Sequence, residues 1–191
     1  MRTEETPRPE RPSVDRGVRG PENVRVWMLG GYRISVGSGR SIEQGEWRLR
    51  KAASLVKLLA LAPGHCLHRE QAMALLWPDS GKTAASNNLR QVLYGARRVL
   101  DPASGSPERY LTLRDEQIAL CPDGRLWVDV DTFEEAAATA RRSRDPAAYR
   151  AAIDLYSGEL LPEDRYEEWA EGRREQLRQL NLALFAELAS L

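Results

Sequence analysis

Amide and basic side chains follow one another at helical spacing between residues 82 and 100 and have the chemistry needed to read DNA bases. Asn87 and Gln91 are four residues apart, so a helix would place both on one face. An amide can bond adenine N6 and N7 together, and an arginine such as Arg90 can bond guanine. No Asp or Glu occurs from residue 82 to residue 100, although exposed helix faces usually mix acids with bases. The expected base-reading residues are Thr83, Asn87, Asn88, Arg90 and Gln91.

Basic residues around this segment are expected to hold the phosphate backbone, which positions a protein on DNA without reading its sequence. For Arg48, Arg50 and Lys51, which start an earlier helix, simple solvation is an equal alternative. Arg114, at the tip of a hairpin, is expected to enter a minor groove, although two acids beside it weigh against this role. The expected phosphate-binding residues are Arg48, Arg50, Lys51, Lys82, Tyr94, Arg97 and Arg98.

The sequence supplies little for catalysis or metal binding. It has two histidines and no glycine-rich phosphate loop or nucleophile–base pair, so we expect no enzyme activity and no cofactor. His65, Cys66 and His68 resemble a fragment of a metal site, but no second Cys/His cluster accompanies them, and no metal is expected. Cys66 and Cys121 are expected to be reduced thiols, although one disulfide could form.

Three helices in the centre of the chain are predicted to position the basic face. Apolar residues of segments 49–62, 69–77 and 83–100 recur at three- and four-residue intervals, and a proline follows each segment within two residues. The second and third helices would form a helix-turn-helix. Opposite the polar face, the third helix carries an apolar stripe made of Ala85, Leu89, Val92, Leu93, Ala96 and Leu100.

Short β-rich runs flank these helices. Residues 24–36 predict a hairpin around Gly30-Gly31, and a third strand is expected near residues 46–49. Residues 110–120 alternate around a polar turn and predict a second hairpin, which would form a wing beside the helix-turn-helix.

The second part of the chain changes to continuous helical periodicity and to the opposite charge. Residues 24–128 carry 15 basic and nine acidic residues, whereas residues 129–191 carry eight basic and 14 acidic residues. We expect a disordered, proline-rich leader over residues 1–23, a DNA-binding domain over residues 24–126 and a helical domain over residues 127–191. The helical domain is expected to be truncated, because the chain stops on an apolar helix face.

Eight short motifs follow one another in the chain: residues 67–71 (LHREQ), 75–79 (LLWPD), 85–91 (ASNNLRQ), 96–100 (ARRVL), 127–133 (WVDVDTF), 155–162 (LYSGELLP), 166–169 (YEEW) and 173–175 (RRE). In this order they resemble the Streptomyces antibiotic regulatory protein family and its AfsR-like relatives. Residues 80–82 (SGK) differ from the proline-rich loop that usually precedes the family's recognition helix.

The resemblance implies an α+β winged helix-turn-helix of the OmpR/PhoB type, with an N-terminal sheet, three helices and a C-terminal β-hairpin wing. An all-α, tetratricopeptide-like bacterial transcriptional activator domain would follow it. The implied function is a bacterial transcriptional activator that binds tandem direct repeats in double-stranded DNA and recruits RNA polymerase. Some relatives carry further C-terminal domains, so the natural chain is expected to continue past Leu191.

We expect a monomer in solution that pairs head to tail on DNA. No apolar run reaches the roughly 18 residues that a membrane helix needs, and the charged N-terminus is not a secretory signal, so a cytoplasmic protein without membrane contact is expected. The alternative function is a helical-repeat scaffold for protein interaction, with a winged helix that no longer reads DNA. A steep loss of affinity with salt would distinguish DNA binding from this alternative.

Overall fold

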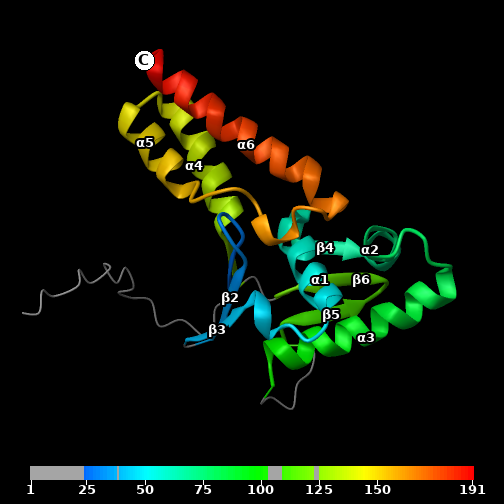
Figure 1. Cartoon of the computed structure of the whole chain (residues 1–191). Helices are drawn as coiled ribbons and strands as arrows, with labels where there is room; N and C mark the ends of the chain where they lie inside the picture. The colour runs from blue at the N-terminus through cyan, green and yellow to red at the C-terminus, as the bar shows by residue number, and fades with distance from the viewer. Residues whose placement is uncertain (1–23, 38, 103–108, 123–124) are drawn as a thin grey trace, which may run out of the picture.

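The computed structural model describes residues 24–37, 39–102, 109–122 and 125–191 (Figure 1). The predicted disordered leader, residues 1–23, lies outside this part of the chain. The chain is a mixed α/β structure in which two small sheets and three helices precede three further helices. None of the described helices combines the length and the apolar character needed to cross a lipid bilayer.

The first sheet is confirmed as a hairpin but differs from the prediction in its third strand. The strand expected near residues 46–49 is wrong, because the chain turns back directly after the second strand. Gly37 and Gly39 adopt positive φ angles of 63° and 136°, which permit this early turn, so pairing resumes at residue 40. The strands, in the spatial order β3-β2-β1-β7, are β1 (Val24–Trp27), β2 (Arg33–Val36), β3 (Arg40–Glu43) and β7 (Leu126–Val128).

The three central helices form as predicted. The predicted apolar stripe of the third helix is buried along its whole length, which confirms the helical periodicity. The first of these helices is buried on all sides from residue 52 to residue 60, as expected for a helix enclosed by other elements. The helices are α1 (Arg50–Leu61), α2 (Arg69–Leu76) and α3 (Lys82–Leu100).

A second sheet packs against these three helices. The predicted second hairpin is present, and its strands pair antiparallel around a turn at Asp115 and Glu116. The strand before α2 was not predicted, because three residues are too few to show an alternating pattern. The strands, in the spatial order β4-β6-β5, are β4 (Cys66–His68), β5 (Leu111–Arg114) and β6 (Gln117–Leu120).

The remaining helices extend from the first sheet (Figure 1). Strand β7 crosses the predicted domain boundary between residues 126 and 127 and pairs parallel to β1. The next helix starts at Asp129, directly after β7, so no linker separates the sheet from the helical part. The helices are α4 (Asp129–Ser143), α5 (Pro146–Leu155) and α6 (Glu168–Ala189), with a 3-10 turn, η3 (Pro162–Asp164), before α6.

Main-chain contacts join the loop before α6 to the turn between β1 and β2. Leu29 forms an isolated antiparallel bridge with Leu160, and the Gly30 N–H donates to Glu159 O at 2.9 Å. The two backbones are so close that a Cβ on Gly158 would lie 2.8 Å from the Gly30 Cα. Glycine is therefore required at residue 158, and the two parts of the chain are held by backbone contact.

The carboxylate of Asp129 fastens the same turn from the other side. Its Oδ2 accepts hydrogen bonds from the main-chain N–H groups of Met28 and Leu29, both at 2.8 Å, and its Oδ1 accepts one from Val130. Burial raises the pKa of Asp129, although these three donors act in the opposite direction. Asp129, in the first turn of α4, therefore ties the start of this helix to the turn between β1 and β2.

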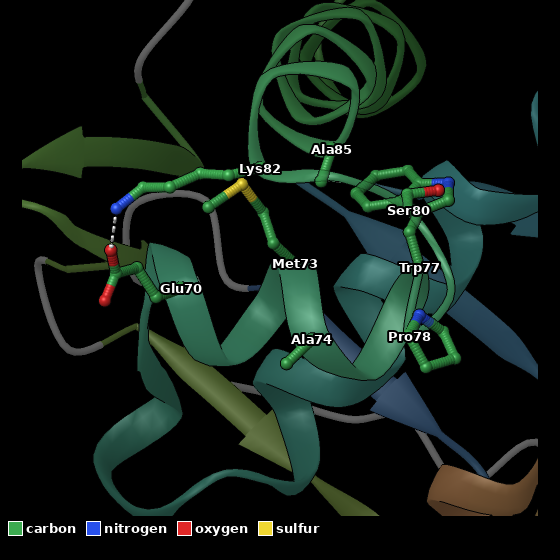
Figure 2. A pocket seen from close by; sticks show the side chains of 8 residues that line it. All are labelled: Glu70, Met73, Ala74, Trp77, Pro78, Ser80, Lys82 and Ala85. Carbon is green, nitrogen blue, oxygen red and sulfur yellow. Dashed lines mark hydrogen bonds and ion pairs between the residues drawn. The ribbon is translucent and has the colours of Figure 1, made fainter.

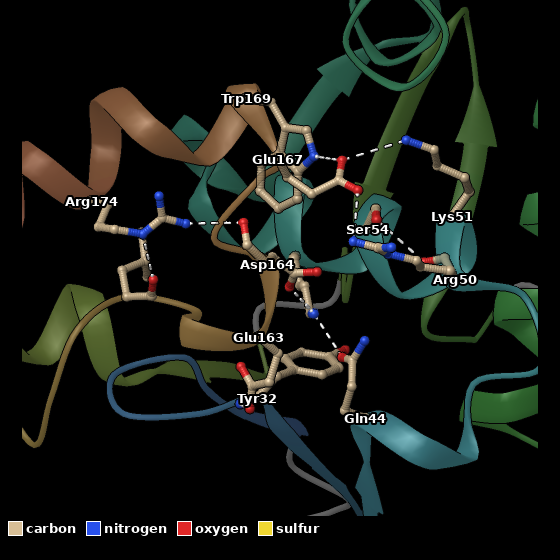
Figure 3. Close-up of polar contacts among 12 residues, drawn as sticks. Tyr32, Gln44, Arg50, Lys51, Ser54, Glu163, Asp164, Glu167, Trp169 and Arg174 are labelled. Carbon is tan, nitrogen blue, oxygen red and sulfur yellow. Dashed lines mark hydrogen bonds and ion pairs between the residues drawn. The ribbon is translucent and has the colours of Figure 1, made fainter.

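A buried ion pair connects α1 to η3. Lys57 and Asp164 are 0% and 1% exposed, and the Lys57 ammonium donates to the Asp164 carboxylate and, at 2.7 Å, to Gln44 Oε1 (Figure 3). The same ammonium lies 4.2 Å from the centre of the Tyr32 ring. Burial lowers the pKa of Lys57, and the Asp164 carboxylate opposes this shift. Because both charges are removed from water, each depends on the other for its stability.

We expect Asp164→Ala to lower the free energy of unfolding by about 3–5 kcal/mol, because it leaves the Lys57 ammonium buried without its counterion. The double variant Lys57→Met/Asp164→Leu removes both charges and should recover most of this loss. Urea unfolding followed by circular dichroism would measure both effects. A single variant as stable as the wild type would contradict the structural role of the pair.

His65 and Asp131 form a second, partly exposed pair across the same junction. His65 Nε2 lies 3.3 Å from Asp131 Oδ2, and this hydrogen bond raises the pKa of His65 above its usual value. A raised pKa in the folded state means that the pair stabilises the protein below the ordinary histidine pKa. This stabilisation is lost as the pH rises through the raised pKa.

We therefore expect Asp131→Asn to lower the pKa of His65 toward 6.5, as measured by NMR titration of its imidazole protons. The stability difference between wild type and variant should be largest at acidic pH and should disappear above the raised pKa. A difference that grows with rising pH would refute the pairing.

Candidate nucleic-acid interface

The polar face of α3 is open to solvent. Thr83, Asn87, Arg90 and Gln91 are exposed, whereas Asn88 is half-buried at the edge of this face. The opposite face of α3 is packed against the core, so the helix cannot rotate to hide these side chains. The structure thus brings the predicted base-reading residues together on one accessible surface of a 19-residue helix.

Two of these side chains are already ordered with respect to each other. Arg90 Nη1 donates to Asn87 Oδ1 at 3.1 Å, which keeps the two polar groups next to each other. Gln91, Tyr94 and Arg98 have no hydrogen-bond or ion-pair partner among the described residues, and Tyr94 is 66% exposed. The donors and acceptors of these side chains are available to a ligand.

The start of α3 is tied to α2 by the pair Lys82–Glu70. Their N–O distance is 2.8 Å, and the contact raises the pKa of Lys82 and lowers that of Glu70. Figure 2 shows this pair at one rim of a pocket between the two helices, where Met73 and Trp77 face Ala85. Both charged side chains are largely exposed, so Lys82 can exchange Glu70 for a phosphate at small cost.

Arg97, predicted to bind phosphate, has a partner within the protein. Its Nε donates to Leu111 O at 2.9 Å, and its side chain is half-buried between α3 and β5. Arg98 is exposed on the next position of the helix. The two neighbouring arginines therefore differ, because Arg97 braces the hairpin and Arg98 points to solvent.

The hairpin formed by β5 and β6 lies beside α3, and Arg114 is exposed at its tip. Asp115 and Glu116 both have positive φ angles, 48° and 65°, which are characteristic of a tight two-residue hairpin turn. Asp115 and Glu116 are the two acids expected to weaken a minor-groove contact by Arg114, and both lie at the tip of the hairpin. Glu116, however, is engaged by another residue of the protein.

Arg69, the first residue of α2, connects the hairpin turn to α3. Its main-chain N–H donates to Glu116 O at 2.8 Å, and its Nη1 lies 3.2 Å from Glu116 Oε2. Its Nη2 donates to Ser86 Oγ at 2.8 Å. One side chain therefore connects α3 to the hairpin tip. No local pattern in the sequence indicates this role of Arg69, because its partners are 17 and 47 residues away.

Arg50 and Lys51 lie at the junction with the helical part instead of on the α3 face. Arg50 Nη2 is 3.3 Å and Lys51 Nζ is 3.5 Å from the carboxylate of Glu167, which also accepts from Trp169 Nε1 (Figure 3). Arg48 is exposed and has no such partner among the described residues. The phosphate role of Arg50 and Lys51 stays a prediction that competes with their pairing to Glu167.

Comparisons with known proteins support the fold. No family model matches the sequence, and no curated protein matches it. The fold is similar to that of EmbR from Mycobacterium tuberculosis, solved in complex with a low-affinity phosphopeptide, with a TM-score of 0.65 and 17% sequence identity. The similarity covers 86% of this chain and 44% of EmbR, so the chain spans less than half the length of that protein. At this identity the similarity establishes a shared fold.

If Arg69 positions the hairpin, Arg69→Ala should free the turn while the fold persists. We expect faster amide hydrogen exchange at residues 114–117 and a loss of no more than about 1 kcal/mol in unfolding free energy, because the lost contacts are partly exposed. Arg173→Ala removes a comparable ion pair, with Glu134, and serves as the control. Unchanged exchange at the turn in Arg69→Ala would show that the arginine is not needed there.

Proposed function

We propose that this chain is a sequence-specific DNA-binding transcription regulator whose α3 helix lies in the major groove. The observation that carries the proposal is the exposed, acid-free face of α3, where amide and guanidinium groups project from a helix anchored on its other side. Asn87, Arg90 and Gln91 have the groups that bond base edges. Thr83, at the start of α3, and Asn88, half-buried at the edge of the face, complete the proposed base-reading set.

The hairpin and the surrounding basic residues extend this contact to the backbone. In the proposed complex, Arg114 approaches the minor groove, and Lys82, Tyr94 and Arg98 hold phosphates on either side of the recognition helix. In this proposal, the exposed Arg48 is a further phosphate contact. Arg69 keeps the hairpin in register with α3, so that both grooves are reached together.

The resemblance to antibiotic regulatory proteins, together with the fold shared with EmbR, supports a role at promoters. In this proposal, monomers bind tandem direct repeats head to tail, and the helical part contributes to contact with RNA polymerase. The exposed apolar side chains of α6, Leu182 and Phe185, at 49% and 50% exposure, also suit a protein contact. They favour a protein partner for the helical part, alongside the DNA-binding role of the first part.

We expect Asn87→Ala and Gln91→Ala each to weaken binding to the preferred DNA site by about 1–3 kcal/mol and to relax the base preference at one position. Selection of bound sequences from random DNA, followed by fluorescence anisotropy on the selected site, would measure both effects. Gln179→Ala, which removes an exposed amide from α6, should leave affinity and preference unchanged. Wild-type base preference in both test variants would refute the assignment of α3 as the reading helix.

Arg98→Ala should behave differently, because a phosphate contact does not depend on sequence. We expect it to weaken preferred and random DNA equally and to reduce the slope of log affinity against log salt by about one. A loss restricted to the preferred site would move Arg98 to the base-reading group.

A further inference from the structure

The outer face of the first sheet carries two tryptophans and two arginines. Val24 and Val26 of β1 point into the core, so the alternating Arg25 and Trp27 lie on the solvent side. The strand register places Trp27 opposite Arg33 of β2 and Arg25 opposite Trp127 of β7. Arg25, Trp27, Arg33 and Trp127 thus form one patch, termed here the Trp–Arg face.

Three of the four side chains of the Trp–Arg face contact one another. The Trp27 and Trp127 ring centres are 5.4 Å apart, and Arg33 Cζ lies 3.8 Å from the Trp27 ring centre. Neither Arg25 nor Arg33 has a carboxylate partner among the described residues. Tryptophan and arginine are the side chains that contribute most to the energy of protein interfaces. A positively charged patch with two aromatic rings suits a partner with aromatic and acidic groups.

The start of α6, together with Tyr166 just before the helix, presents that chemistry. Tyr166 is 91% exposed, and Glu168 and Glu171 are exposed without an ion-pair partner among the described residues. No hydrogen bond, ion pair or ring contact links these three residues to the Trp–Arg face within the described chain. In the part of the chain that the structure describes, the Trp–Arg face therefore carries positive charges without acidic partners, and the start of α6 carries negative charges without basic partners.

We infer that the Trp–Arg face of one molecule binds the start of α6, with Tyr166, Glu168 and Glu171, on a second copy. Because the two surfaces differ, the contact is heterologous and arranges copies head to tail without two-fold symmetry. On DNA this arrangement fits tandem direct repeats, and in that form the inference rests on the proposed function. Attachment to adjacent repeats raises the effective concentration of the copies, so a contact that is weak in solution becomes significant on DNA.

The contact can be tested without DNA by sedimentation velocity in about 50 mM salt at protein concentrations up to about 1 mM. We expect weak, concentration-dependent association of the wild type and at least a tenfold loss in Arg25→Ser/Arg33→Ser and in Glu168→Gln/Glu171→Gln. An equimolar mixture of the two double variants retains one intact pair of surfaces and should form dimers that grow no further. A wild type that stays monomeric throughout, or a mixture without dimers, would overturn the inference.

DNA carrying two direct repeats supplies the second arm. Arg25→Ser/Arg33→Ser should reduce the cooperativity of binding about tenfold. The control is Arg142→Ser/Arg150→Ser, which removes two positive charges elsewhere on the protein. The affinities of the two double variants for DNA with a single repeat should agree within twofold. Insertion of half a helical turn, about 5 bp, between the repeats should abolish wild-type cooperativity.

The outcomes separate the inference from the proposed function. A single-repeat affinity well below that of the control variant would show that the Trp–Arg face binds nucleic acid and would overturn the inference. Absence of any DNA binding by the wild type would refute the proposed function, and the sedimentation experiment would then decide the inference.

Discussion

The buried ion pair between Lys57 and Asp164 is the constraint on which the rest of the arrangement depends. It lies between α1, which is enclosed by the first part of the chain, and η3, which leads into α6. Arg174 of α6 adds hydrogen bonds from its guanidinium to the carbonyls of Leu160 and Asp164, so this loop is held from two sides. Such a pair stabilises only one geometry, because any displacement leaves a buried charge without its partner.

This rigidity extends to α3. The core side of α1 contacts α3, and α1 is in turn fixed to the helical part by Lys57 and by the pairing of Arg50 and Lys51 with Glu167. The helical part is thus connected to α3 through packed elements, without a flexible linker between them. The polar environment of the pair is itself tightly enclosed, and burial raises the pKa of Tyr32 well above its usual value.

The exposed charges divide into two groups with different uses. Many acids of the helical part are neutralised within it, as in the pairs Glu134–Arg173, Glu175–Arg178 and Glu187–Arg141. Arg141 of α4 and Tyr149 of α5 both contact the carboxylate of Glu187 in α6, which fixes α4 and α5 to α6. In contrast, Arg98 on α3 and Arg25 and Arg33 on the sheet have no acidic partner among the described residues. Their charges are therefore available to other molecules.

The amino-acid sequence by itself determined the helices and the polar face of α3, because a 3.6-residue period separates Leu89 and Leu93 from Asn87 and Gln91 over many residues. It also determined the hairpins, where alternation and turn residues are local signals. Only the tertiary structure decided which charges are free. Lys57 is one of the 15 basic residues between residues 24 and 128, yet it is buried and paired with Asp164. No local pattern shows this, because Asp164 lies 107 residues away in the sequence. Arg50, Lys51, Arg69 and Arg97 likewise acquired partners that no local pattern encodes, since ion pairs between distant segments form only when the chain is folded.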